Sequence, residues 1–272
     1  MLEGERLKPQ SKEEGRTEMR DLEGRIALVT GSSRGIGQAT ARALAAAGAR
    51  VIATDIEAPD ALASDIGGWA RKLDVTSEDD WVDAMAFASS FAGGLDILVN
   101  NAGVLTFRKL IDMSLEDWRR IQAVNVEGTF LGCKYAIPLL SDRASQWIGG
   151  TSIINMSSIA GLRGNPDFTA YAASKGAIRL LSKSLALELA ERKIRVNSVH
   201  PGLIETSMGR ETASHFAERH KFTPPSDPND IAEPLVGAGS PTSVADVIVF
   251  LASDRAAFMT GSEVVVDGGL TA

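Results

Sequence analysis

Short apolar runs alternate along the chain with longer segments in which apolar residues return every three or four positions. The first run, residues 25–30, is bounded by Gly24 and Gly31, and its four consecutive apolar residues at 26–29 are typical of a strand buried on both faces. Runs of this kind predict strands at residues 25–30, 50–55, 72–75, 96–101, 152–156, 195–199 and 263–266. Helical periodicity predicts helices near residues 36–47, 78–88, 115–140, 171–191 and 244–253.

This alternation determines the fold class that we expect. Strands separated by helices pair in parallel through right-handed crossovers, which places helices on both faces of the sheet. The pattern contains no internal repeat and no second set of strands. We therefore expect an α/β protein with a single doubly wound parallel sheet, the Rossmann fold, in one domain over residues 24–272.

Two segments depart from the pattern. Residues 1–23 mix Glu, Lys and Arg without apolar periodicity, and we expect a disordered tail. A partner-binding arm is the alternative, and a natural start at Met19 is another; a chain beginning there is expected to fold and to turn over substrate like the full one. Residues 203–241 are rich in proline, and they follow a strand at whose carboxyl end such sheets bind ligands. We expect a substrate lid there, with a variable surface loop as the alternative.

The composition of the chain limits the kinds of partner and location that we expect. The net charge of -7 and the lack of a Lys/Arg cluster argue against binding nucleic acid. No apolar run reaches the roughly 18–20 residues that would cross a bilayer. Cys133 is the only cysteine, which excludes an intrachain disulfide and agrees with a reducing, cytoplasmic location.

The segment between the first predicted strand and the first predicted helix is rich in glycine. Gly31, Gly35 and Gly37 allow a tight turn and let the backbone approach a pyrophosphate at the helix N-terminus. Asp55 ends the next strand, where a carboxylate can bind ribose hydroxyls and repel a 2′-phosphate. Arg34 could instead meet that phosphate, but we expect Asp55 to dominate and the cofactor to be NAD.

Further motifs follow in order, each at the end of a predicted strand or on a predicted helix. They are Asn-Asn-Ala-Gly at 100–103, Asn125 in Val-Asn-Val-Glu-Gly at 124–128, Ser157-Ser158, Tyr-Ala-Ala-Ser-Lys at 171–175, Pro201-Gly202 with Thr206, and Val-Asp-Gly-Gly at 266–269. With the glycine segment, this series resembles the short-chain dehydrogenase/reductase family, in its form of about 250 residues and of the NAD type. The resemblance covers the chain from about Leu22 onward.

Tyr171 and Lys175 are four residues apart and share one helix face. Because a free phenol has a pKa near ~10, we expect the ammonium and a nicotinamide cation to lower the pKa of Tyr171 so that it acts as acid and base. The resemblance implies that Ser158 holds the substrate oxygen, while Ser157 points the other way, and that Asn125 completes a proton relay through water. The catalytic residues expected are Asn125, Ser158, Tyr171 and Lys175.

The resemblance also implies the cofactor contacts. They are Gly31, Ser33, Arg34, Gly35, Ile36, Gly37, Asp55, Ile56, Asp74, Val75, Asn101, Ala102, Gly103, Tyr171, Lys175, Pro201, Gly202, Ile204 and Thr206. No metal site is expected, because the three histidines have no partners at ligand spacing. We expect His215 and His220 to lie on a solvated helix face of the lid.

These residues predict an NAD(H)-dependent oxidoreductase of secondary alcohols and ketones. An NADPH-dependent reductase of 3-oxoacyl thioesters is the alternative, and a cofactor-binding sensor or scaffold without turnover is a third possibility. The expected pocket is mainly apolar, which favours a cyclic or aliphatic substrate; its candidates are Leu105, Leu162, Arg163, Phe168, Leu203, Met208 and Phe222. A homotetramer is expected from the resemblance, the two long helices and the apolar last strand.

Overall fold

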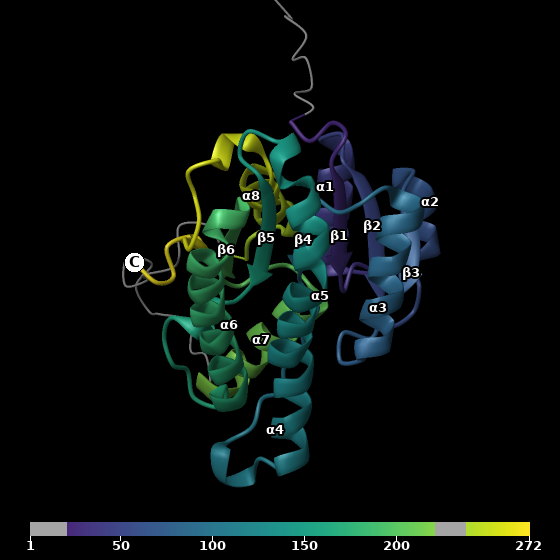
Figure 1. The fold of residues 1–272 in the computed structure, drawn as a ribbon. Coiled ribbons are helices and arrows are strands. Elements are labelled where there is room, and N and C mark those ends of the chain that lie inside the picture. The colour runs from purple at the N-terminus through teal and green to yellow at the C-terminus, as the bar shows by residue number, and fades with distance from the viewer. Residues whose placement is uncertain (1–20, 221–237) are drawn as a thin grey trace, which may run out of the picture.

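The computed structural model describes residues 21–220 and 238–272, which form one parallel sheet covered by helices on both faces (Figure 1). The strands lie in the order β3-β2-β1-β4-β5-β6-β7. Leu28 of β1 lies opposite Ile52 of β2 on one side and Leu98 of β4 on the other. The chain therefore changes direction across the sheet between β1 and β4, where sheets of this kind bind their ligands.

The elements have the following bounds. The strands are β1 Ile26–Thr30, β2 Arg50–Asp55, β3 Trp69–Lys72, β4 Ile97–Asn100, β5 Thr151–Met156, β6 Ile194–Pro201 and β7 Glu263–Val266. The helices are α1 Gly35–Ala46, α2 Asp60–Ile66, α3 Glu78–Phe87, α4 Leu115–Gln122, α5 Gly128–Arg143, α6 Thr169–Glu188, α7 Ser207–His220 and α8 Pro241–Ala252. Within the described ranges, none of them combines the length and the apolar character needed to cross a membrane.

Side chains on alternate strand positions enter two separate cores. In β1, Ile26 and Leu28 face the core beneath α3, α5 and α6, whereas Ala27 and Val29 face the core beneath α1, α2 and α8. Because both faces of β1 are buried, the strand carries an unbroken apolar run, as the sequence predicted. In Figure 1 the two helical layers enclose the sheet, and α4 and α7 lie beyond the carboxyl ends of the strands.

Two predicted elements differ from the structure, and helix α2 lies where no helix was predicted. The third strand is Trp69–Lys72, so the predicted strand at 72–75 was placed too late. The predicted helix at 115–140 is α4 and α5 joined by a π-helical turn, Ala123–Glu127, and it extends to Arg143. The remaining strands lie within about two residues of their predicted bounds.

The two irregular segments are partly described. Leu22 is fully buried and its backbone N–H bonds to the carbonyl of Ala47, so the predicted tail boundary at residue 23 was wrong for residues 21–23. Residues 1–20, Met19 included, lie outside the described part. Segment 203–241 contains a regular helix, α7, where an irregular insert was expected. Its residues 221–237 lie outside the described part, so the expected lid stays a prediction.

The amino ends of the strands meet a buried ionic network. Asp96, immediately before β4, accepts hydrogen bonds from the backbone N–H of Ile26 at 2.8 Å, from Arg143 Nε at 2.8 Å and from Trp147 Nε1 at 2.5 Å. The carboxylate is fully buried and has a donor at each of these three positions. It thus ties the starts of β1 and β4 to the end of α5.

A second half of this network begins at Arg25, which lies directly before β1. Its guanidinium donates to Asp254 Oδ1 at 2.6 Å and to the carbonyl of Gly150 at 3.0 Å. Arg195 in β6 donates only to backbone carbonyls. We call this set the amino-end network; its members are Arg25, Asp96, Arg143, Trp147, Arg195 and Asp254.

Candidate active site

The glycine segment between β1 and α1 packs against the loop that follows β4. Gly31 has a φ of +64°, and a Cβ there would lie 2.9 Å from the Cα of Ala102. A Cβ on Gly37 would overlap the carbonyl oxygen of Gly31. Asn101 fixes this contact, because its Nδ2 donates to the carbonyls of Thr30 at 2.9 Å and Gly31 at 3.0 Å. Glycine is required at these positions by close backbone contact.

The N-terminus of α1 has no side-chain cap. Arg34 occupies the cap position and its side chain accepts no bond there, whereas Ser77, Ser114 and Ser240 cap α3, α4 and α8. The first N–H groups of α1 therefore keep their capacity to bind an anion. Together with the tight glycine turn, this end of α1 fits the pyrophosphate of a nicotinamide dinucleotide.

Asp55 ends β2 beside this loop. Its two oxygens accept hydrogen bonds from the backbone N–H of Ser33 at 3.0 Å and of Ile56 at 2.9 Å. The residue is half-buried, so the carboxylate also has a solvent-facing side that fits ribose hydroxyls. Arg34 lies close by in the chain and is exposed.

The turn after β3 holds the two residues predicted to meet the adenine. Asp74 Oδ1 accepts bonds from the backbone and the hydroxyl of Thr76, and the Val75 carbonyl accepts from Trp81 Nε1. Val75 is buried against Gly128, where a Cβ would lie 2.8 Å from its Cγ2. Both residues are thus fixed by their neighbours at the carboxyl edge of the sheet.

Asn125 lies in the π-helical turn between α4 and α5. Its carboxamide accepts from the N–H of Val104 at 2.8 Å and donates to the Val104 carbonyl and to Ser174 Oγ, both at 3.0 Å. The backbone carbonyl of Asn125 accepts from the Thr129 hydroxyl at 2.7 Å. Asn125 therefore fastens the loop after β4 to α6.

Tyr171 and Lys175 lie on α6, as their spacing predicted. Tyr171 is 8% exposed, and burial raises the pKa of its phenol to about 12, although a hydrogen bond with Ser158 lowers it in part. The lowered pKa expected from the sequence includes the charge of a nicotinamide cation, so for the protein with bound cofactor it stays a prediction. Lys175 Nζ lies 5.6 Å from the phenol ring centre and donates to the Met156 carbonyl at 2.7 Å. Burial lowers the pKa of Lys175 to about 8.

The two serines after β5 point in different directions. Ser157 Oγ donates to the backbone carbonyl of Lys175 at 2.9 Å and is buried. Ser158 Oγ accepts from the N–H of Ala160 at 3.1 Å and contacts the phenol of Tyr171. Ser158 is thus the serine that reaches the Tyr171 phenol, as expected. Gly103 completes this arrangement, because a Cβ on it would lie 3.5 Å from Lys175 Nζ.

The segment after β6 closes the site. Pro201 ends the strand, and a Cβ on Gly202 would lie 2.8 Å from the Cα of Asp267. Thr206 Oγ1 accepts from the Gly209 N–H at 3.0 Å and caps α7, while its methyl group lies against Gly35. Ile204 is buried in the core, so its side chain packs inside the protein. The glycine segment and the start of α7 are therefore in contact.

An aromatic cluster next to Tyr171 was not predicted as a unit. Phe107 stacks on His215 of α7 with ring centres 4.4 Å apart, and Phe168 lies edge-on to Phe107 at 5.1 Å and to Tyr171 at 6.2 Å. His215 Nε2 lies 3.2 Å from Asp167 Oδ2. The expectation that His215 is solvated was therefore wrong. No sequence motif signals the Asp167–His215 pair, whose residues are 48 positions apart.

The remaining predicted positions differ in how far they are exposed to solvent. Arg163 is exposed, and Ile56 at the adenine side is 64% exposed. Phe222 and the side chain of His220 lie outside the part that the structure describes. Half-buried pocket candidates are Leu105, Leu162, Leu203 and Met208. Among residues 21–220 and 238–272, no three His, Cys, Asp or Glu side chains gather as a metal site would require.

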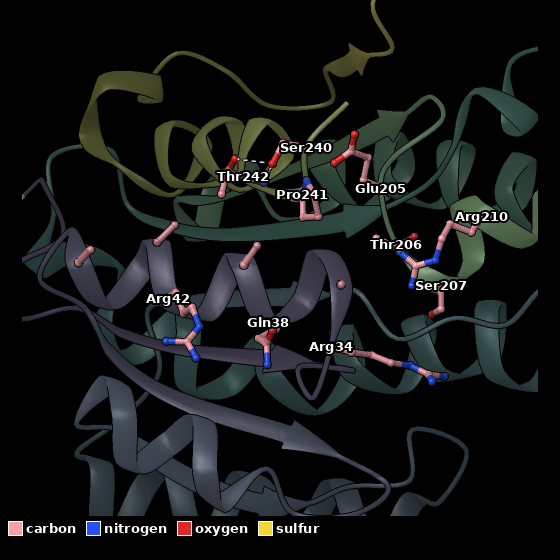
Figure 2. Close-up of a pocket in the computed structure, with 14 residues that line it drawn as sticks. Arg34, Gln38, Arg42, Glu205, Thr206, Ser207, Arg210, Ser240, Pro241 and Thr242 are labelled. Atoms are coloured by element: carbon pink, nitrogen blue, oxygen red, sulfur yellow. Dashed lines mark hydrogen bonds between the residues drawn. The ribbon is translucent and has the colours of Figure 1, made fainter. Parts of the chain in front are cut away.

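A surface groove of about 660 Å³ runs between α1 and α8. Figure 2 shows Arg34, Thr206 and Arg210 at one end and Arg42 further along α1. The groove shares Arg34, Gly35 and Thr206 with the expected cofactor contacts, but Ser158, Tyr171 and Lys175 do not line it. It therefore adjoins the expected cofactor contacts rather than Ser158, Tyr171 and Lys175.

Comparisons with known proteins agree with this geometry. A family model described as enoyl-(acyl carrier protein) reductase matches residues 31–271. The chain is 41% identical over 256 residues to a 3-alpha-(or 20-beta)-hydroxysteroid dehydrogenase of Mycobacterium tuberculosis, covering 92% of this chain and 91% of that protein. It is 37% identical to an NADP-dependent (R)-specific alcohol dehydrogenase of Lentilactobacillus kefiri, covering 92% and 98%. A short-chain type dehydrogenase/reductase from Mycobacterium marinum superposes with a TM-score of 0.83 at 34% identity, covering 93% and 98%.

Proposed function

The chain belongs to the short-chain dehydrogenase/reductase family and is an oxidoreductase of alcohols or ketones; from this premise we propose that it transfers hydride between NAD(H) and a cyclic secondary alcohol or ketone. The observation that carries the proposal is the buried phenol of Tyr171, which contacts Ser158 and lies beside Lys175 at the carboxyl end of the sheet. A protein that only bound the cofactor would not require this acid/base.

In the proposed reaction the protein's groups hold and move one proton. During ketone reduction Tyr171 donates its proton to the substrate oxygen, and during alcohol oxidation its phenolate takes the hydroxyl proton. Ser158 holds that oxygen with its hydroxyl. A bound nicotinamide ring supplies or accepts the hydride. Lys175, when protonated, favours the phenolate, and Asn125 links it to solvent through water.

The preference for NAD(H) rests on Asp55. Its carboxylate would accept charge-assisted hydrogen bonds from ribose hydroxyls, each contributing about 1.5–3 kcal/mol. A 2′-phosphate would remove a donor and face a like charge, at a cost of a few kcal/mol at an effective dielectric near ~20. Arg34 is exposed, and an exposed ion pair returns only about 0–1 kcal/mol.

The ratio of kcat/KM with NAD and NADP tests this assignment. We expect NAD to be favoured by about 10²-fold, equivalent to roughly 2.7 kcal/mol, and Asp55→Ser to narrow or reverse the ratio by improving NADP use. Asp83→Ser, an exposed acid on α3, is the control and should leave the ratio unchanged. A wild-type preference for NADPH, or an Asp55→Ser ratio equal to the wild type, would show that Arg34 governs the cofactor.

The substrate class follows from the aromatic cluster. Phe107, Phe168 and His215 pack together beside Tyr171, and such an aromatic wall suits a flat apolar ring more than a charged or acyclic chain. The hydroxysteroid dehydrogenase relative acts, by its name, on hydroxysteroids, which are built on fused apolar rings. A panel of cyclic and acyclic secondary alcohols should show higher kcat/KM for the cyclic ones, and Phe107→Ala should reduce that difference. Equal rates across the panel would contradict the assignment.

A second candidate is an NADPH-dependent reductase of 3-oxoacyl thioesters. Arg34 beside the glycine loop and the acyl-carrier description of the family model favour it. The same kinetic assay with a 3-oxoacyl thioester and NADPH separates the two, and an absence of turnover with every substrate would favour a sensor or scaffold.

The assembly proposed is a cytoplasmic homotetramer. Leu187 on α6 is 82% exposed and Leu180 is 63% exposed, while Phe130 on α5 and Val265 on β7 are also exposed. Association of several copies would cover these side chains. Light scattering at micromolar concentration should give about four times the 28.8 kDa of one chain, and a species of one chain mass would contradict it.

A further inference from the structure

His200 is a fully buried histidine that the proposed reaction does not use. It lies in β6, one residue before Pro201, behind the turn that carries Ser158. Its Nδ1 lies 3.1 Å from the Ser158 carbonyl oxygen, and its Nε2 lies 2.9 Å from Ser198 Oγ. Both ring nitrogens therefore have a partner inside the protein.

The two partners determine which nitrogen carries the proton. A carbonyl oxygen only accepts, so Nδ1 must donate to Ser158, and in a neutral ring Nε2 then accepts from the Ser198 hydroxyl. Burial lowers the pKa of His200, which agrees with a neutral ring. The charged groups that act on it are Glu263, which favours the cation, and Arg179 and Lys175, which oppose it.

The Ser158 carbonyl is the point at which the turn is joined to the neighbouring strand. The last backbone bond between β5 and β6 runs from the Ser157 N–H to the Val199 carbonyl at 2.8 Å. Ser158 itself is extended, with φ −169° and ψ 161°, and within its own turn its carbonyl accepts only from the Gly161 N–H at 2.9 Å. The His200 ring thus continues the attachment of the turn to β6 by one residue, to the serine that contacts Tyr171.

We propose that His200 is a positioning residue, which holds the Ser158 hydroxyl at the substrate oxygen through its Nδ1–H bond to the Ser158 carbonyl. The proposal rests on the proposed role of Ser158. It assigns to His200 no contact with substrate or cofactor. The Nε2–Ser198 bond serves only to keep the proton on Nδ1.

Two substitutions of similar size distinguish the role of Nδ1 of His200 from that of Nε2. In His200→Asn the amide nitrogen stands where Nδ1 was and can still donate to Ser158, whereas in His200→Gln the amide reaches the position of Nε2 and Ser198. We expect His200→Asn to keep kcat within about threefold of the wild type, and His200→Gln to lower kcat by roughly ten- to a hundredfold, because small displacements of a reacting group have effects of that size. The KM for cofactor and the thermal midpoint should be alike in the two variants.

Equal losses in both variants, or a wild-type kcat in His200→Gln, would overturn the proposal. If His200→Gln does not fold, His200→Leu carries the same expectation, since it also lacks the donor and needs no polar partner. Ser158→Ala is the reference. Wild-type kcat in Ser158→Ala would mean that the proposed function of the site is wrong, whereas loss in Ser158→Ala with retention in His200→Gln would refute the role of His200 alone.

Discussion

The two ends of the sheet bury polar groups in different ways. At the amino end, Asp96 receives three donors, and Arg25 is matched by Asp254 and a backbone carbonyl. At the carboxyl end, Tyr171 and Lys175 are just as buried, but neither is matched with an opposite charge. The amino end holds satisfied ion pairs, and the carboxyl end holds single titratable groups.

The pKa values reflect this difference. Burial raises the pKa of Tyr171 to about 12 and lowers that of Lys175 to about 8, so both neutral forms are favoured. Such groups respond to a charged ligand, because it restores part of the interaction that solvent would have given. At the amino end the charged groups are already paired within the protein, so they contribute to stability and do not respond to a ligand. Substitutions at the two ends should therefore change different quantities.

Tyr171→Phe should have the largest effect at the carboxyl end. Loss of the acid/base is expected to lower kcat by about 10³-fold or more, while the retained ring preserves packing and cofactor binding. Steady-state kinetics with cofactor titration and thermal unfolding as controls would measure this. A kcat within tenfold of the wild type would show that Tyr171 is not the acid/base.

Asp96→Asn, at the amino end, should lower the stability of the protein and leave kcat almost unchanged. The amide would turn a donor toward a ring of donors and leave Arg143 without its counter-charge, which we expect to cost about 3 kcal/mol of unfolding free energy. Denaturant titration measures this, and kcat of the folded protein should stay within about twofold of the wild type because the chemistry lies at the opposite end of the sheet. A large fall in kcat at unchanged stability would show that the two ends are coupled.

The pH dependence sharpens the comparison at the carboxyl end. Because the pKa of Tyr171 is raised to about 12, the phenol keeps its proton through neutral pH, and ketone reduction should be nearly constant between about pH 6 and 8. Alcohol oxidation needs the phenolate, so its kcat/KM should rise with pH, by up to about tenfold per pH unit. Initial rates in both directions at constant ionic strength test this; oxidation that slows as pH rises would contradict it.

Arg42→Ala should have the smallest effect, and it provides an exposed ion pair with which the buried pairs of the amino-end network can be compared. The Arg42–Asp65 pair joins α1 to α2 with both side chains about half exposed. We expect a loss of less than about 1 kcal/mol in the free energy of unfolding. A loss as large as that of Asp96→Asn would mean that burial is not what distinguishes the two pairs.

The sequence predicted the fold wherever burial imposes a pattern. Strands covered on both faces, such as β1 and β4, carry short runs of apolar residues, and these runs predicted their positions. Strand β3 was misplaced because it is the edge strand, and its residues Trp69–Lys72 are half or fully exposed and include two charges. Helix α2 was missed because it has only seven residues after Pro59.

The short motifs predicted that Ser158, Tyr171 and Lys175 come together, and the structure places them side by side, while their catalytic roles stay predictions. Contacts between distant segments were not predicted. The His200–Ser158 and His215–Asp167 contacts join residues 42 and 48 positions apart, and no motif or residue spacing in the sequence predicts them. The burial that raises the pKa of the Tyr171 phenol could not be read from the helix spacing.

The strand order also has a consequence for how the protein is made. After β1, β2 and β3 have formed, β4 adds to the free edge of β1, and β5, β6 and β7 each add to the edge left by the strand before them. The sheet can therefore grow in the order of synthesis, one edge at a time. Arg25 meets Asp254 only when this growth is nearly complete, since 229 positions separate them. The bond between them should form after the folding nucleus, so that its loss would hasten unfolding more than it delays folding.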